Sequence, residues 1–317
     1  MMRPWATALL ALALLAVAPL TPHCQEAAMS VADFDALWDY RDPAATEVKF
    51  RALLPEAEQG DPDLHAQLLS QIARCEGLQR NFEEARHILD EAERVSGGKA
   101  GTAAVRILLE RGRTYNSDGD AATAIPYFDA ALRQAQERKL DFYAVDAAHM
   151  LGIASPGDEG LAWNLKAIDM AQASEDPRAR GWLGSLLNNT GWSYHDAGDY
   201  AKALTLFEQA LDFRREKGRQ PEIRIAEWCV ARCLRSLGRL DEALAMQRDL
   251  ERQWAEAGGQ GDGYVHEELG ELLLAKGQAE AARPYFAKAH ALLSQDPWLQ
   301  ANEEARLERL AELGDVK

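Results

Sequence analysis

The sequence contains few of the residues that mark a disulfide-stapled or metal-bound protein. Only four of its 317 residues are cysteine, and their spacing is not that of a disulfide framework. Cys229 and Cys233 lie four residues apart on a predicted helix, but a structural zinc needs four ligands and no second pair stands at zinc-finger spacing. Buried free thiols are the better interpretation. We therefore expect neither a metal nor another cofactor.

Basic residues are also in the minority. The chain has 35 Lys and Arg residues against 51 Asp and Glu residues, which gives a formal net charge of −16. A field of that sign repels nucleic acids and anionic lipids, because both carry dense negative charge. We therefore expect no nucleic-acid partner and no membrane contact apart from the N-terminal segment.

Aromatic residues make up only 8% of the chain, and long β-branched runs are absent. Ala, Leu, Glu, Arg and Gln dominate instead, and these residues are strong helix formers. The composition therefore predicts an all-α protein.

The N-terminus holds the one apolar run that resembles a targeting segment. Residues 1–23 begin with a single Arg and continue as an Ala- and Leu-rich stretch, which is a signal-peptide pattern. Pro4 and Pro19 bound this stretch, so it is short for a spanning helix of ~20 residues. We expect residues 1–28 to be a signal peptide or N-terminal anchor, which would make the protein periplasmic or otherwise exported. In the alternative, translation starts at Met29 and the protein is cytoplasmic.

A repeated pattern is what the sequence has in abundance. The clearest unit reads Leu187-x-x-Thr190-Gly191-x-x-Tyr194, then Gly198-Asp199-Tyr200, then Ala203-x-x-x-Phe207-x-x-Ala210. It resembles the tetratricopeptide repeat, in which Leu, Gly and Tyr mark a first helix and Ala, Phe and Ala a second. A small residue at Gly191 lets the two helices press together. Gly198 is expected to end the first helix in a left-handed conformation, and Asp199 to cap the second.

The same frame recurs at intervals of 36 to 43 residues, against roughly 34 in the standard repeat. The six units begin at Ala66, Val105, Asp141, Gly184, Arg224 and Gly263. The unit from Asp141 is degenerate, because Asn164 stands where the aromatic residue should be. The units look like extended members of the family, such as those of kinesin light chains. The resemblance implies a right-handed α-solenoid of stacked helix-turn-helix repeats.

The repeats divide the chain into four expected parts. Residues 29–65 are expected to form N-terminal capping helices after the leader, residues 66–297 the six repeats, and residues 298–317 a C-terminal capping helix. Terminal caps are needed because each repeat packs only on its neighbours and the last ones would expose their core.

The resemblance also implies where a partner would bind, since the first helices of such repeats line the concave face. With the motif glycine at position 8, position 9 holds Arg in three units and position 6 holds Asn in one. The candidate peptide-binding residues are Arg74, Arg113, Asn189, Trp192 and Arg232. Guanidinium groups suit carboxylates, so an acidic segment or a free C-terminus is the expected ligand.

Two observations compete with this hypothesis. Arg side chains often pair with Glu on the next helix, and a Trp at helical spacing is more often packed than free. Some family members bind carboxylates with Lys and Asn at set positions. Asn189 matches such an Asn at position 6, but Lys is absent from position 2, where Arg106 is the only basic residue. We also expect the fold to tolerate loss of Arg74, Arg113 and Arg232.

Motifs that would carry catalysis are incomplete. His266-Glu267-Glu268 lacks the second His of a zinc-protease helix, and the glycines of residues 258–263 lack the Lys of a phosphate-binding loop. We therefore expect a protein that is not an enzyme but a scaffold or adaptor that binds a partner protein or peptide in its concave groove. The alternative is a regulatory sensor that binds a short peptide or a small molecule.

Overall fold

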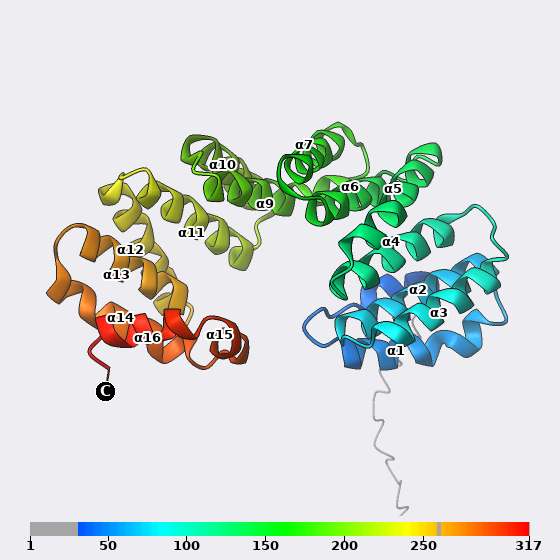
Figure 1. The fold of residues 1–317 in the computed structure, drawn as a ribbon, viewed down its shortest axis with the longest axis horizontal. Coiled ribbons are helices and arrows are strands. Elements are labelled where there is room, and N and C mark those ends of the chain that lie inside the picture. Colours follow the sequence, from blue (N-terminus) through cyan, green and yellow to red (C-terminus); the bar gives the residue numbers. More distant parts are fainter. Residues whose placement is uncertain (1–30, 259–260, 317) are drawn as a thin grey trace, which may run out of the picture.

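The computed structural model describes residues 31–258 and 261–316, and every regular element in them is helical (Figure 1). The elements are η1 (Val31–Leu37), α1 (Pro43–Ala57), α2 (Pro62–Leu78), α3 (Phe82–Ser96), α4 (Thr102–Ser117), α5 (Ala121–Glu137), α6 (Asp141–Ala154), α7 (Gly157–Ala173), α8 (Pro177–Gly181), α9 (Leu183–Asp196), α10 (Tyr200–Lys217), α11 (Gln220–Ser236), α12 (Leu240–Glu256), α13 (Gly263–Ala275), α14 (Ala279–Leu293), α15 (Pro297–Asn302) and α16 (Glu304–Leu313). The expected leader, residues 1–28, lies outside the described residues.

Antiparallel helix pairs stack side by side into an arch, which confirms the predicted α-solenoid. The pairs are α2–α3, α4–α5, α6–α7, α9–α10, α11–α12 and α13–α14. In Figure 1, α4, α6, α9 and α11 lie toward the inner side of the arch, and α5, α7 and α10 lie toward its outer side. The first helices of these four pairs therefore face the inner side. No helix in the described parts of the chain is long and apolar enough to cross a lipid bilayer.

A glycine on the first helix and a phenylalanine on the second hold three of the pairs at close range. A Cβ atom added to Gly191 would lie 2.6 Å from the ring of Phe207, and one added to Gly270 would lie 2.7 Å from Phe286. Gly112 meets Phe128 in the same way. These rings are among the most deeply buried side chains of the described residues. The motif glycine is thus needed for space, because a packed interior leaves none for a methyl group.

The degenerate third unit replaces this contact with a smaller one. Asn164 of α7 is buried and lies against Gly152 of α6, so closely that a Cβ there would clash with the amide. Gly152 stands one helical turn beyond Ala148, the residue at the motif position. The pair therefore keeps a small-residue contact with a polar side chain in place of a ring.

The turn of the clearest unit forms as the sequence predicts. Gly198 has a φ of 81°, in the left-handed region that favours glycine. The carboxylate of Asp199 accepts a hydrogen bond from the backbone N–H of Lys202 at 3.2 Å and so caps α10.

A short extra helix separates the third and fourth units. Asp176 caps α8, whose five residues stand between α7 and α9 and account for the 43-residue step between these units. This insertion places Arg178 and Trp182 beside the inner face, where they line a cavity together with residues of α4 and α6.

Replacing Gly191 with Ala tests the glycine–phenylalanine contact. The fully buried Phe207 ring has no free space to enter, so we expect the free energy of unfolding to fall by about 1–3 kcal/mol, even though Ala favours a helix by ~1 kcal/mol over Gly. Urea unfolding followed by circular dichroism measures the change. Gly181→Ala is the control, because a Cβ there meets no atom within 4 Å. Equal stability of the two variants would show that the Phe207 ring moves aside and that its contact with Gly191 does not limit how closely the two helices pack.

Candidate functional site

Ion pairs connect the first helices of neighbouring units along the inner face. The arginine at position 9 of one unit meets the acidic residue at position 6 of the next. Arg74 lies 3.1 Å from a carboxylate oxygen of Glu110, and Arg113 pairs with Asp146. Arg113 also reaches back to Glu110 at 2.6 Å. We call the pairs Arg74–Glu110, Arg113–Asp146 and Arg232–Glu268 the ionic ladder.

The acidic members of the ionic ladder are buried, so each needs its arginine. Glu110 is 4% exposed and Asp146 is 5% exposed. Burial opposes the charge of Arg113, but Asp146 and Glu110 outweigh it and hold the pKa of this guanidinium above its usual value. A carboxylate in such a site that loses its partner is strongly destabilising.

The C-terminal end of the ionic ladder carries one cation more than it has acids. Arg232 lies 3.7 Å from Glu268, and Arg235 binds the same carboxylate at 3.0 Å. Burial raises the pKa of Glu268 against the opposing effect of Arg235 and Arg232. Burial and the neighbouring Arg235 lower the pKa of Arg232. Arg232 is therefore only partly neutralised.

The pairing of Arg113 with two buried carboxylates argues against the expectation that the fold tolerates loss of all three position-9 arginines. Replacement of Arg113 by Glu would leave three carboxylates together, with Glu110 and Asp146 both buried. Loss of one partner of a buried pair typically costs about 3–5 kcal/mol. A variant of this kind would lose binding through unfolding, whatever the role of the guanidinium.

The middle of the inner face is neutral and aromatic. Trp192 is half-buried, and its ring centroid lies 5.1 Å from Phe207 and 6.0 Å from Trp228. Asn189 is exposed. Burial raises the pKa of the nearby Cys229 thiol to about 11, so this sulfur stays protonated and unreactive at neutral pH.

A cavity of about 310 Å³, here called the N-terminal pocket, opens on the first half of the inner face. Its walls come from the N-terminal cap, from α2, α4 and α6, and from the α8 insertion. The lining residues are Asp35, Trp38, Tyr40, Gln71, Arg74, Arg106, Leu109, Glu110, Arg113, Phe142, Tyr143, Asp146, Arg178 and Trp182.

Aromatic rings and guanidinium groups alternate around the N-terminal pocket. Trp38 and Tyr40 stack with ring centroids 4.6 Å apart, and Arg74 lies 5.6 Å from the Tyr40 ring. Arg178 lies 5.1 Å from the ring of Phe142. Tyr40 is 61% exposed and the Arg178 side chain is 64% exposed. Arg178 also pairs with Asp176 at 3.0 Å, so these two side chains offer a flat ring and an exposed cation that Asp176 shares.

The sequence-predicted site residues do not form one cluster. Arg74 and Arg113 line the N-terminal pocket, whereas Asn189, Trp192 and Arg232 are not among its lining residues. The contribution of the cap and of the insertion does not follow from the repeat pattern, because these residues lie outside the repeat frame. The long step between the third and fourth units was the only signal of the insertion.

A second, apolar cavity of about 410 Å³ lies among α11, α12 and α13. Its lining residues are Pro221, Arg224, Ile225, Trp228, Trp254, Asp262, Tyr264 and Val265. Ile225 is 52% exposed, and Arg224 lies over the Trp254 ring at 4.7 Å. This cavity suits an apolar side chain.

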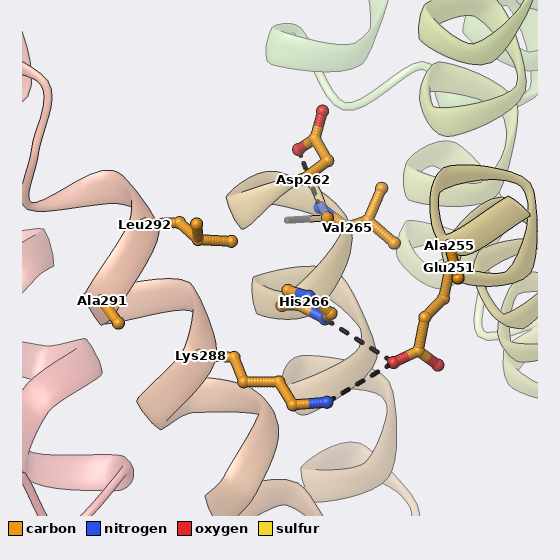
Figure 2. Close-up of a pocket in the computed structure, with 9 residues that line it drawn as sticks. Glu251, Ala255, Asp262, Val265, His266, Lys288, Ala291 and Leu292 are labelled. Carbon is orange, nitrogen blue, oxygen red and sulfur yellow. Dashed lines mark hydrogen bonds and ion pairs between the residues drawn. The ribbon is translucent and has the colours of Figure 1, made fainter. Parts of the chain in front are cut away.

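A third cavity, of about 380 Å³, holds a polar group of three side chains from α12, α13 and α14 (Figure 2). His266 Nδ1 and Lys288 Nζ each lie 3.8 Å from the same carboxylate oxygen of Glu251. His266 is 5% exposed, and its Nδ1 has no hydrogen-bond partner within the described residues. Burial, and then Lys288, lower the pKa of His266 against the effect of Glu251. Nowhere in residues 31–258 and 261–316 do three His, Cys, Asp or Glu side chains gather as metal ligands.

Two family models, both described as Tetratricopeptide repeat, match the sequence. One matches residues 148–216, and the other matches residues 79–138 and 188–258. Together the matches extend over α3 and over four helix pairs, from α4–α5 to α11–α12, apart from the first residues of α6. A search of curated proteins finds no match to this chain.

Solved structures share the fold at low sequence identity. RapI in its apo form is 10% identical, with a TM-score of 0.67 over 84% of this chain and 76% of that one. A Signal Transduction ATPase with Numerous Domains protein from Pyrococcus horikoshii, described as having a tetratricopeptide repeat sensor, is 16% identical with a TM-score of 0.64. The match covers 88% of this chain but only 44% of that one, so this chain spans less than half of it. BtubC from P. vanneervenii is 16% identical, with a TM-score of 0.55 over 72% of this chain and 93% of that one.

The buried His266 predicts a pH dependence of stability. Its pKa is lower in the folded protein than the usual 6.5, so the unfolded chain binds this proton more readily. The free energy of unfolding should therefore fall as the pH drops below about 6.5, by at most about 1.4 kcal/mol per pH unit from this residue. Urea unfolding between neutral pH and pH ~5 measures the slope. His266→Gln should reduce the slope, whereas His87→Gln, at an exposed site on α3, should not. An unchanged slope in His266→Gln would contradict this assignment.

Proposed function

Because the chain belongs to the tetratricopeptide repeat family, whose repeats generally mediate protein–protein interaction, we propose that it is a non-catalytic adaptor. In this proposal a segment of a partner protein lies along the inner face, and the N-terminal pocket is its main anchor. The observation that carries the proposal is the exposure of Tyr40 and Arg178. The Arg178 side chain stays 64% exposed although it pairs with Asp176 at 3.0 Å, whereas the other charged groups of the cavity pair with one another.

The chemistry of the N-terminal pocket defines the expected partner. Stacked rings favour a planar or apolar side chain, and the exposed guanidinium of Arg178 favours a carboxylate. An acidic segment or a free C-terminus with a neighbouring apolar residue supplies both. The net charge of −16 opposes acidic ligands over the molecule as a whole, so a cationic pocket would restrict them to one place.

The second half of the inner face would extend the contact. Asn189 is exposed, Trp192 is half-buried, and Arg232 shares its carboxylate with Arg235. The apolar cavity around Ile225 and Trp228 offers a place for another apolar side chain. A segment that reaches both cavities would gain affinity from two linked contacts.

A sensor that binds a short peptide or a small molecule is the second candidate. The observation that favours it is the size of the N-terminal pocket, since about 310 Å³ is at the lower end of small-ligand sites. The Pyrococcus horikoshii protein with a similar fold is itself described as having a repeat sensor. As for location, we propose an exported protein if residues 1–28 act as a signal and a cytoplasmic one if translation starts at Met29.

The double variant Tyr40→Ala/Arg178→Ala tests the adaptor proposal. Both side chains are exposed, so the fold should persist, while recovery of a partner in affinity capture should fall at least about tenfold. The measurement is capture by the tagged full chain from cytosolic and envelope fractions of the native cells, with mass spectrometry of the bound proteins.

The matched control is Arg133→Ala on α5. Arg133 has a 65% exposed side chain and one ion pair with an acidic neighbour, like Arg178 with its 64% exposed side chain. A partner recovered equally by the control and by the double variant would exclude the N-terminal pocket as the anchor. If no partner is recovered in either fraction, the sensor becomes the better proposal.

A further inference from the structure

Arg106 of α4 is a buried cation at the wall of the N-terminal pocket. It is 5% exposed, and its guanidinium lies 5.0 Å from the ring of Phe34. Its Nη2 and Nη1 donate to the two carboxylate oxygens of Asp35 at 2.6 Å and 2.8 Å. Nη1 also donates to the hydroxyl of Tyr143 at 3.1 Å. This two-pronged geometry is the strongest arrangement between a guanidinium and a carboxylate.

Asp35 differs from the other carboxylates of the pocket. Glu110 and Asp146 have side chains only 5% and 7% exposed and stand on the first helices of repeats. The Asp35 side chain is 56% exposed and belongs to η1, which precedes the repeats. Within the described residues its carboxylate accepts hydrogen bonds from Arg106 alone. Asp35 is therefore the carboxylate that can leave the pocket toward water.

The departure of Asp35 would not dismantle the cap. Phe34 next to it is 2% exposed, and its ring meets Phe50 of α1 edge to face, with centroids 5.9 Å apart. This contact would hold the backbone of η1 in place if the Asp35 side chain rotated outward. The cation left behind, however, is buried, and an unpaired buried charge is costly. Another carboxylate must therefore take the position that Asp35 vacates.

We propose that Arg106 and Tyr143 form a binding site for a carboxylate of the partner, which Asp35 occupies until the partner displaces it. This inference rests on the proposed function of the N-terminal pocket and adds its ligand and its mode of control. The displaced and the incoming carboxylate make the same two hydrogen bonds, so the exchange by itself gains little. A ligand must therefore also contact the rings around the pocket, which excludes acids that lack an apolar neighbour.

By competing for Arg106, Asp35 also raises the ligand concentration that is needed to occupy the site. A group tethered beside its site competes at an effective concentration in the millimolar range. Removal of the competitor should therefore tighten binding of a weakly bound peptide by at least about tenfold.

The test uses the full chain and a fluorescein-labelled octapeptide with Trp beside a C-terminal Glu. Fluorescence anisotropy should show that Asp35→Asn binds the peptide at least about tenfold more tightly than wild type. Asp90→Asn is the control, because it makes the same change of charge at an exposed carboxylate that pairs with Arg111. An amidated copy of the peptide and a copy with Gln for Glu show whether the terminal or the side-chain carboxylate binds.

The double variant Asp35→Asn/Arg106→Gln separates this site from a general effect of charge. It removes both members of the pair, so no lone buried charge remains, and the gain in affinity should disappear. A gain that persists in the double variant, or no gain in Asp35→Asn, would overturn the proposal. Neither result would decide the adaptor proposal, which is tested separately by partner recovery with the Tyr40→Ala/Arg178→Ala variant.

A second measurement serves if Asp35→Asn folds poorly. Acetate at ~50 mM should raise the melting temperature of Asp35→Ala relative to chloride at equal ionic strength, because the small carboxylate replaces the lost one. Wild type and Asp90→Ala should not respond. Equal responses of all three proteins would show that Arg106 holds no exchangeable carboxylate.

Discussion

The close approach of two helices within each pair is the constraint on which the rest of the structure depends. Glycine on the first helix and a buried ring on the second bring Gly112 to Phe128, Gly191 to Phe207 and Gly270 to Phe286. The stacking of pairs then sets which first-helix side chains face one another. Each pair packs mainly on its neighbours, and the glycine–phenylalanine contact recurs in three of the six pairs. The ionic ladder follows from this regular spacing.

The ionic ladder explains why the inner face combines many charges with little free charge. Its carboxylates are buried and matched by arginines. What remains available to a partner is found where the regular pattern ends. The N-terminal cap and the α8 insertion provide the aromatic rings. At Glu268, two arginines share one carboxylate, which leaves one cation unmatched.

The sequence predicts the fold well because the repeat signature is itself a packing rule. The glycine at 191, the left-handed turn at Gly198 and the cap at Asp199 each follow from one local requirement, and all three are found. The candidate site was harder to predict. Arg74 and Arg113, both at position 9, line the N-terminal pocket, but whether an arginine is free depends on the next helix. The pairing of Asp35 with Arg106 joins residues 71 positions apart, and the periodicity of the repeats does not predict it.

The α8 insertion has a consequence for how arrays of this kind diversify. Five residues placed in a joint bring Arg178 and Trp182 to a cavity without altering any glycine–phenylalanine contact. A solenoid can thus acquire a new recognition surface by lengthening a connection, while selection on its interior keeps the architecture unchanged. Two such proteins can therefore superimpose closely and still recognise unrelated molecules. The helix interiors then preserve the shared fold, while changes in the connections between units alter the specificity.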